Sequence, residues 1–305
     1  MQIKSTLKTM CLFLSLCIAT GCVSLGEKVV ALKDIPYAIA SKSQKLDLYL
    51  PDSHSGPYPL IIFIHGGGFN SGSKSDIDSQ LLGLKKGYAV ASLNYRLSDE
   101  NKFPAQVHDV KAAVKFLRKN ASTYRLRANH FAAWGVSAGG NLAAMVGSTG
   151  NNENFYNKKL GNQEISDQIQ AVVNWYGPIY FSDMDAQFRA LNIDSAYKIN
   201  SEDSPESKYL GAVIGSKKAT QKVKMASPQS YISKKTAPIM IQHGTTDRYV
   251  PYMQSKIYAT KLKKVLGSKK VFYSLIDHAG HGGKEFASKS NLEKVFKFLD
   301  RHLKR

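Results

Sequence analysis

The stretch HFAAWGVSAGGN, residues 130–141, joins an apolar run to a series of small residues. The apolar part predicts a buried strand, and the small residues that follow predict a helix. Gly135, Ser137 and Gly139 fit the pattern G-x-S-x-G between these two elements. In that context the pattern is typical of a sharp turn that exposes the serine at the carboxyl end of a sheet. A small-residue turn needed only for packing is the alternative, so the interpretation depends on which other residues could act with Ser137.

Strand and helix patterns alternate on both sides of this stretch. Predicted strands lie at residues 45–51, 59–65, 87–95, 130–136, 169–177, 237–244 and 269–276, and predicted helices at 104–120, 137–147, 252–266 and 290–303. This alternation favours an α/β domain with a mostly parallel central sheet and helices on both faces. The segment from 178 to about 230 is polar and weakly periodic, and an insertion of this length predicts a small cap over a ligand site.

A second glycine-rich segment, HGGGF at residues 65–69, directly follows the apolar run PLIIFI. Consecutive glycines allow the backbone to approach a ligand closely. In serine hydrolases such a loop supplies N–H donors to the oxyanion of a tetrahedral intermediate. We expect these donors to be Gly67 and Gly68, joined by the N–H of Ala138. We expect the ring of His65 to brace the loop rather than to transfer protons.

The sequence IMIQHGTTDRYVP places Asp247 in the loop after the predicted strand 237–244. An acid at this position could orient a histidine that activates a serine hydroxyl. An Asx turn would explain the local TTDR sequence equally well. Asp277, which precedes a histidine later in the chain, is the fallback acid.

Two histidines follow the last predicted strand, in SLIDHAGHGG (274–283). We favour His281 as the base because glycines flank it and free the loop to bring its ring to the site. His278 is the fallback. Ser137, Asp247 and His281 then follow the chain order Ser, Asp, His of α/β-hydrolases.

The first 22 residues differ in composition from the rest of the chain. Two lysines precede an apolar run of roughly ten residues, too short to span a bilayer, and small residues then lead to Cys22. This layout predicts a signal peptide over residues 1–21. The ending ATGC resembles the lipobox of bacterial lipoproteins, which implies a diacylated Cys22 that anchors the mature chain to a membrane. A plain secretory signal is the alternative.

Residues 22–43 are expected to form a tether and the start of a first edge strand, and residues 44–305 the α/β domain. The three cysteines lie at positions 11, 17 and 22, so the mature chain has no second cysteine for an internal disulfide. We therefore expect an exported protein of the bacterial cell envelope, on the outer membrane or the periplasmic face. Without a lipid on Cys22 it would be secreted.

The chain is strongly basic, with 42 Lys and Arg residues against 23 Asp and Glu residues and a formal net charge of +19. The lysines are scattered, and no RNA-type or zinc-type motif accompanies them, so we expect no nucleic-acid partner. An anionic membrane surface is the partner that such a charge favours. Most individual lysines are expected to belong to a solvated face without a specific partner.

Six ordered blocks, from about residue 44 to 303, carry a family resemblance. They are HGGGF, NYRLS with FPAQVHDVKAAVKFLRKN, WGVSAGGNLAA, VVNWYGP, HGTTDRYVPYMQS and HAGHGG. The chain resembles α/β-hydrolases of the hormone-sensitive-lipase-like and feruloyl-esterase-like (BD-FAE-like) group. The resemblance implies hydrolysis of carboxylic esters without a metal or cofactor. It implies Ser137 as nucleophile, Asp247 and His281 as its relay, and Gly67, Gly68 and Ala138 as oxyanion donors.

The same resemblance leaves the substrate open. The segment after VVNWYGP lines the acyl or alcohol pocket in relatives and is not diagnostic here. Small and aryl carboxylic esters, among them acetylated or feruloylated polysaccharide, short-chain glycerides and synthetic polyesters, all fit. Asp109 matches an acid near the start of a helix in the group, and we expect it to be structural. An amide or formamide hydrolase, or a serine peptidase on the same fold, is the alternative activity. A non-catalytic surface binding protein is less favoured, because the serine, acid, histidine and glycine loop are all present.

Overall fold

The structure, a computed structural model, describes residues 29–51 and 56–304. The predicted signal peptide (1–21), Cys22 and the first part of the predicted tether lie outside these residues. Within the described ranges, none of the helices combines the length and the apolar character needed to cross a membrane.

Strands and α-helices alternate along the described residues. The strands are β1 (Val30–Pro36), β2 (Lys45–Leu50), β3 (Tyr58–Ile64), β4 (Ala89–Leu93), β5 (Leu126–Val136), β6 (Ala171–Trp175), β7 (Ile239–Gly244) and β8 (Val271–Ile276). The helices are α1 (Leu82–Lys85), α2 (Ala105–Lys119), α3 (Ala138–Ser148), α4 (Met184–Leu191), α5 (Pro205–Leu210), α6 (Lys217–Met225), α7 (Met253–Leu266) and α8 (Lys289–Leu303). Every strand and helix predicted from the sequence is therefore present near its predicted position.

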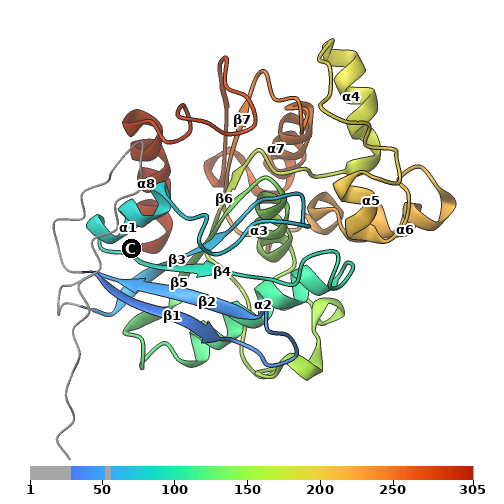
Figure 1. Cartoon of the computed structure of the whole chain (residues 1–305). Coiled ribbons are helices and arrows are strands. Elements are labelled where there is room, and N and C mark those ends of the chain that lie inside the picture. The colour runs from blue at the N-terminus through green and yellow to red at the C-terminus, as the bar shows by residue number, and fades with distance from the viewer. Residues whose placement is uncertain (1–28, 52–55, 305) are drawn as a thin grey trace, which may run out of the picture.

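The strands form one sheet in the order β1-β2-β4-β3-β5-β6-β7-β8 (Figure 1). β2 runs antiparallel to both of its neighbours, β1 and β4, and all other neighbouring pairs are parallel. The predicted α/β fold with a mostly parallel sheet is thus confirmed. β1 is an edge strand of this sheet and lies within the segment where an edge strand was expected.

Helices cover both faces of the central part of the sheet, and β3, β4, β6 and β7 are accordingly buried along their whole length. In β3, Leu60, Ile62 and Ile64 belong to a core cluster that includes residues of α2, α3 and α7. Ile61, which points the opposite way, belongs to a second cluster that includes residues of α8. All seven residues of β3 are buried, so this strand is fixed firmly between two helical layers.

The loops that follow β3, β5, β6, β7 and β8 emerge at the same edge of the sheet, because these five strands are parallel and adjacent. This is the edge at which open α/β sheets bind ligands. All of the candidate site residues at positions 67, 68, 137, 138, 247 and 281 lie in these loops or directly after them.

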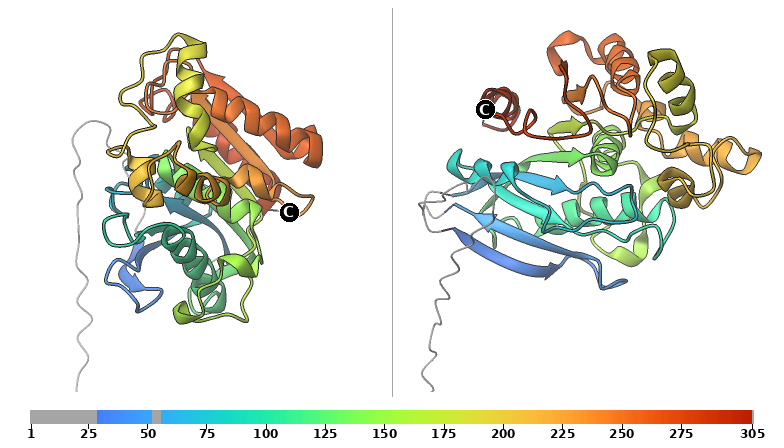
Figure 2. Two further views of the ribbon diagram at one scale, coloured as in Figure 1. Left: turned by 90° about the vertical axis from the view of Figure 1, so that its right-hand side faces the viewer. Right: turned by 45° about the horizontal axis from the view of Figure 1, so that its top comes forward.

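The insertion from 178 to about 230 contains the three short helices α4, α5 and α6. In Figure 1 and in the right view of Figure 2 this yellow-to-gold segment lies at the right-hand side, and in the left view of Figure 2 it faces the viewer. Asn141 of α3 fastens both of its ends, since the side-chain amide donates to the carbonyl oxygens of Pro178 (2.8 Å) and Ala226 (3.3 Å). The insertion is therefore anchored four residues after Ser137.

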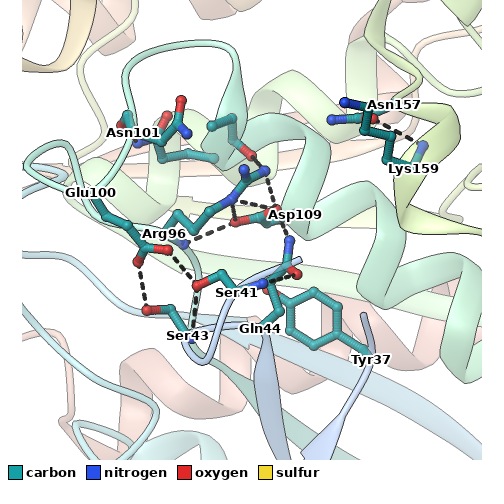
Figure 3. A network of polar contacts seen from close by, with 12 residues as sticks. Tyr37, Ser41, Ser43, Gln44, Arg96, Glu100, Asn101, Asp109, Asn157 and Lys159 are labelled. Carbon is teal, nitrogen blue, oxygen red and sulfur yellow. Dashed lines mark hydrogen bonds and ion pairs between the residues drawn. The ribbon is translucent and has the colours of Figure 1, made fainter. Parts of the chain in front are cut away.

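Asp109 lies in a buried network that is shown in Figure 3. Its carboxylate accepts hydrogen bonds from the guanidinium of Arg96 (2.7 Å from Nη2), from the backbone N–H of Arg96 (2.9 Å) and from the side chain of Gln44 (2.7 Å). These partners come from the loop after β4 and the turn before β2. The network joins three segments of the domain, in keeping with the structural role expected for Asp109.

Candidate active site

Ser137 lies between β5 and α3 with φ of 53° and ψ of −123°, a conformation that residues other than glycine rarely adopt. The turn around it is tight. A Cβ on Gly135 would lie 1.9 Å from the carbonyl oxygen of Gly139, and a Cβ on Gly139 would lie 2.1 Å from the carbonyl oxygen of Ile64. Only glycine fits at either position. The G-x-S-x-G pattern is therefore required by the turn itself, which holds the serine in a strained conformation.

The side chains of Ser137, His281 and Asp247 form a continuous hydrogen-bonded chain. Nε2 of His281 lies 2.7 Å from Oγ of Ser137, and Nδ1 lies 2.7 Å from Oδ2 of Asp247. The Asp247 side chain is fully buried, whereas that of His281 is 18% exposed. The structure thus brings together the serine, acid and base predicted from the sequence, with the imidazole as the link between a buried carboxylate and the serine hydroxyl.

Asp247 uses its two carboxylate oxygens differently. Oδ1 accepts the backbone N–H groups of Tyr249 (2.8 Å) and Val250 (3.0 Å), which is the Asx turn considered as an alternative role. Oδ2 faces His281 at 2.7 Å and His243 at 3.1 Å. Burial by itself raises the pKa of Asp247, but the hydrogen bonds from the two histidines outweigh it and hold the pKa well below its ordinary value. The residue therefore remains ionised at neutral pH while also shaping its own loop.

His243 belongs to this site and was missed by the sequence analysis. It lies on β7 and is fully buried. Its Nε2 is close to two acceptors, Oδ2 of Asp247 (3.1 Å) and the carbonyl oxygen of Val250 (2.9 Å), so Nε2 carries a proton. Nδ1 lies 2.7 Å from the hydroxyl of Ser255, which can donate to it. The signal in the sequence was a histidine inside an apolar strand, four residues before the candidate acid.

The loop after β8 separates the two candidate histidines. A Cβ on Gly244 would lie 2.2 Å from the carbonyl oxygen of Ala279, so glycine at the end of β7 lets this loop pass closely and carry His281 inward. The side chain of His278 is 89% exposed and lies 3.4 Å from that of Asp277, which is 80% exposed. The fallback base and acid therefore contact each other at the surface, outside the hydrogen-bonded chain of Ser137.

A cavity of about 360 Å³ adjoins Ser137. Gly67, Gly68 and Ala138 line it, as does His281. The backbone N–H groups of the three predicted oxyanion donors take part in none of the loop and turn hydrogen bonds found in the described part of the chain. These donors therefore border the same space as the serine hydroxyl and its base.

Tyrosines and residues of the insertion complete the cavity wall. The rings of Tyr176 and Tyr249 flank that of His281, with centroid distances of 4.7 and 5.2 Å. Burial raises the pKa of Tyr176 far above its ordinary value, so its hydroxyl stays neutral. Tyr197 and Glu206 reach the cavity from the insertion. Sequence reasoning did not single out these four residues, because no pattern in their own segments marks them.

His65 lies beside the glycine loop. Its ring stacks on that of Tyr95, with centroids 4.3 Å apart and an interplanar angle of 11°, and the Tyr95 hydroxyl donates to the His65 carbonyl oxygen at 3.1 Å. Burial lowers the pKa of His65, which favours a neutral ring. This arrangement supports the bracing role expected from the sequence.

No cluster of three or more His, Cys, Asp or Glu side chains suited to a metal ion occurs in residues 29–51 and 56–304. The groups gathered around Ser137 are an imidazole, two buried carboxylates, tyrosines and main-chain amides.

Comparison with protein families places this arrangement among known proteins. The family model described as BD-FAE matches residues 46–262. The curated relatives include Esterase LipC of Mycobacterium tuberculosis, 26% identical over 243 residues, which cover 79% of this chain and 57% of the relative. They also include Esterase LipQ of the same organism, 26% identical over 81% of this chain and 56% of the relative. The chain thus spans a little over half the length of these relatives.

Solved structures share the fold over most of the chain. A structure described as a truncated form of a carbohydrate esterase from gut microbiota superposes with a TM-score of 0.82 and 25% identity, over 94% of this chain and all of that one. A bifunctional GH43-CE protein of Bacteroides eggerthii superposes with a TM-score of 0.77 and 29% identity, over 90% of this chain and 35% of that one.

Proposed function

The chain belongs to the BD-FAE family of α/β-hydrolases, and on this premise we propose that it is a serine carboxylesterase that hydrolyses small or aryl carboxylic esters through an acyl-enzyme on Ser137. The observation that best supports the proposal is the chain of two 2.7 Å contacts from Ser137 through His281 to Asp247. A hydroxyl in contact with an imidazole that a buried carboxylate orients is the arrangement that activates serine for acyl transfer.

In the first half of the reaction, Oγ of Ser137 attacks the ester carbonyl carbon while Nε2 of His281 takes the hydroxyl proton. Asp247 holds the imidazole with Nδ1 protonated and stabilises the imidazolium that forms. The tetrahedral intermediate then collapses. The bond between carbonyl carbon and alcohol oxygen breaks, and Nε2 returns its proton to the leaving alcohol.

The second half repeats these steps with water as the nucleophile. His281 removes a proton from water as the water attacks the acyl-enzyme, and it then returns the proton to Oγ as the carboxylic acid leaves. In both halves negative charge develops on the former carbonyl oxygen. The amides of Gly67, Gly68 and Ala138 border the cavity at Ser137, and each donor of this type contributes roughly 3–4 kcal/mol to the transition state.

A direct test combines an active-site label with a substrate series. A fluorophosphonate probe should label the wild-type protein and fail to label Ser137→Ala. The wild type should hydrolyse 4-nitrophenyl acetate, butyrate and octanoate, with the shorter acyl chains preferred, since about 360 Å³ is at the small end for ligand cavities. A matched amide, 4-nitroacetanilide, tests the amide-hydrolase alternative. Labelling that persists in Ser137→Ala would contradict the proposal.

We also propose that residues 1–21 direct export and that Cys22 carries a lipid anchor. The support is the sequence layout alone. Fully extended, residues 22–29 reach at most roughly 30 Å, so such an anchor would keep the domain near the membrane surface. Metabolic labelling with a radioactive fatty acid should mark the wild-type protein in a bacterial host. Unchanged labelling of Cys22→Ser would contradict this proposal.

A further inference from the structure

Glu206 is the one carboxylate among the described residues that line the cavity at Ser137. The residue is only 3% exposed. Its Oε1 accepts a hydrogen bond from the hydroxyl of Tyr197 at 2.9 Å. Its Oε2 is buried as well and has no hydrogen-bond partner among the described residues. A buried carboxylate oxygen without a hydrogen-bond donor is unfavourable. A donor group of a ligand bound in the cavity would satisfy this atom.

Two neighbours of Glu206, Pro205 and Tyr197, link it to the loops that carry the reacting groups. A Cβ on Gly68 would lie 2.9 Å from Cβ of Pro205, so the residue before Glu206 rests against the glycine loop. On the other side, the ring of Tyr249 lies between that of Tyr197 and that of the base, His281. The ring centroids of Tyr197 and Tyr249 are 6.2 Å apart, and those of Tyr249 and His281 are 5.2 Å apart.

The partner of Glu206 is held in place by the loop that carries Asp247. The backbone N–H of Ala196 donates to the carbonyl oxygen of Arg248 (2.7 Å), and Nε of Arg248 donates to the carbonyl oxygen of Asp194 (2.8 Å). Tyr197 directly follows Ala196. The loop that carries Asp247 therefore helps to position the hydroxyl of Tyr197. Through this hydroxyl it also helps to position the carboxylate of Glu206.

We propose, on the basis of the esterase function proposed above, that Glu206 is the specificity-determining residue of the cavity and that its Oε2 accepts a hydrogen bond from a hydroxyl group of the ester substrate. A neutral hydroxyl fits better than a cation, because the net charge of +19 opposes the approach of cations. Tyr176 and Tyr249 line the same cavity and supply aromatic surface for the carbon skeleton of such a substrate. The cavity then selects esters with a hydroxyl near the scissile bond over apolar esters of similar size.

The ionisation of Glu206 adds a pH dependence to this selection. Burial is the largest influence and raises the pKa of Glu206 to about 7, against the lowering effect of its own backbone N–H and of Tyr197. The charged groups that face it from other elements are Asp185 of α4, which raises the pKa, and His281, which lowers it. The carboxylate, the stronger acceptor, therefore predominates above pH 7. The preference for the hydroxylated ester should increase between pH 6 and pH 8.

The test compares two acetates of similar size, a monoacetylated methyl xyloside and cyclohexyl acetate, by their release of acetate. The readout is the ratio of their kcat/KM values, from which any ionisation shared by both reactions cancels. In Glu206→Gln and Glu206→Met this ratio should fall by about ten-fold or more, because a hydrogen bond to a charged group is lost, and its rise with pH should disappear. Glu202→Gln, an exposed acid in the same segment, should leave the ratio unchanged.

Two results would overturn the inference. One is a ratio that stays within two-fold of the wild type in both Glu206 variants while their thermal unfolding shows a folded protein. The other is a larger loss for an acetate with a quaternary ammonium group than for the xyloside, which would make Glu206 a cation site. Hydrolysis of 4-nitrophenyl acetate that depends on Ser137 shows that the esterase proposal stands even when the inference fails. Without such hydrolysis, both fail.

Discussion

Asp247 and Glu206 are two buried carboxylates beside the same cavity, and their surroundings shift their pKa values in opposite directions. Asp247 accepts hydrogen bonds from two backbone amides. Burial raises its pKa, but the two histidines outweigh burial and lower it. Glu206 has a neutral tyrosine as its side-chain partner, and burial raises its pKa to about 7. The first environment stabilises a permanent charge. The second leaves a carboxyl whose charge depends on pH and whose remaining oxygen is available to a ligand.

The two residues represent two regions that are built in different ways. Asp247 lies in a short loop only three residues after β7, so the sheet edge fixes its position. Glu206 lies in the insertion, far from any strand, and is positioned by contacts with distant segments. We therefore assign the chemistry to the strand-end loops and the choice of substrate to the insertion. Substitutions in the loops should reduce kcat for every ester, whereas substitutions in the insertion should change which ester is preferred.

Ser137→Ala is the strongest test of this assignment of chemistry to the loops and substrate choice to the insertion. The variant should lose a factor on the order of 10⁴–10⁶ in kcat with every ester, because the nucleophile is removed. Its thermal unfolding should match that of the wild type, since alanine keeps the same Cβ in the same tight turn. Steady-state assays with two esters of different alcohols measure the effect. More than a tenth of the wild-type activity on either ester would show that Ser137 is not the nucleophile.

Asp247→Asn should be nearly as severe, with a loss of about 10⁴ in kcat. The neutral side chain of asparagine cannot stabilise the imidazolium of His281. If its NH₂ group occupies the position of Oδ2, it also faces the N–H groups of His281 and His243, which are donors themselves. The matched control is Asp277→Asn, which changes the exposed acid beside His278. This variant should keep kcat within two-fold of the wild type. Equal losses in both variants would remove the reason for placing Asp247 in the relay.

The same comparison predicts an unusual pH dependence of stability for Glu206→Gln. An acid whose folded pKa lies above its unfolded value lowers stability as pH rises from about 4.5 to about 7. The variant should therefore be more stable than the wild type by about 3 kcal/mol at pH 8 and lose this advantage near pH 4.5. Urea unfolding at several pH values measures the difference. A pH-independent difference would contradict a buried, titrating Glu206.

For Asp247 the dependence of stability on pH should have the opposite sign. Its lowered pKa contributes stability above the unfolded value of 3.8, and this contribution is lost as pH falls through the folded pKa. In Asp247→Asn the wild-type advantage should therefore shrink on acidification, in the same unfolding experiment. A difference of the same sign in both variants would end the contrast between the two carboxylates.

His243→Leu tests how far the relay extends into the core. The substitution removes the 3.1 Å hydrogen bond to Oδ2 of Asp247 and should lower kcat/KM by about ten-fold for all esters alike, the equivalent of one such bond. His243→Gln, whose amide N–H can still donate, should recover part of the loss. A purely structural His243 would instead show the same loss in both variants, in proportion to their loss of stability.

The fold and the three principal site residues could be predicted because their signals are local. The apolar runs of β3, β5 and β7 mark strands that are covered on both faces. Gly135 and Gly139 mark the tight turn, because a side chain at either position would collide with backbone atoms. Loops directly after parallel strands must then meet at one edge of the sheet. Strand ends and glycines were thus sufficient to bring Ser137 together with groups more than a hundred residues away.

The rest of the site depends on contacts that no local pattern carries. His243 has the same strand context as its apolar neighbours, and only the folded loop brings Asp247 to its ring. Tyr197 and Glu206 lie in a polar segment whose placement depends on Asn141 and Arg248, two side chains outside it. The helices α4, α5 and α6 were for the same reason unpredicted, because their short apolar faces are completed by the neighbouring core.

The smallest expected effect concerns His278, the fallback base, and it requires a careful choice of variant. His278 has φ of 57°, which alanine tolerates less well than asparagine, so His278→Ala would strain the loop that carries His281. His278→Asn keeps the backbone conformation and removes the imidazole. Because the His278 side chain is 89% exposed, its kcat/KM should stay within two-fold of the wild type. A loss above ten-fold with unchanged thermal unfolding would give His278 a part in the chemistry. The catalytic region would then include the exposed part of the loop after β8.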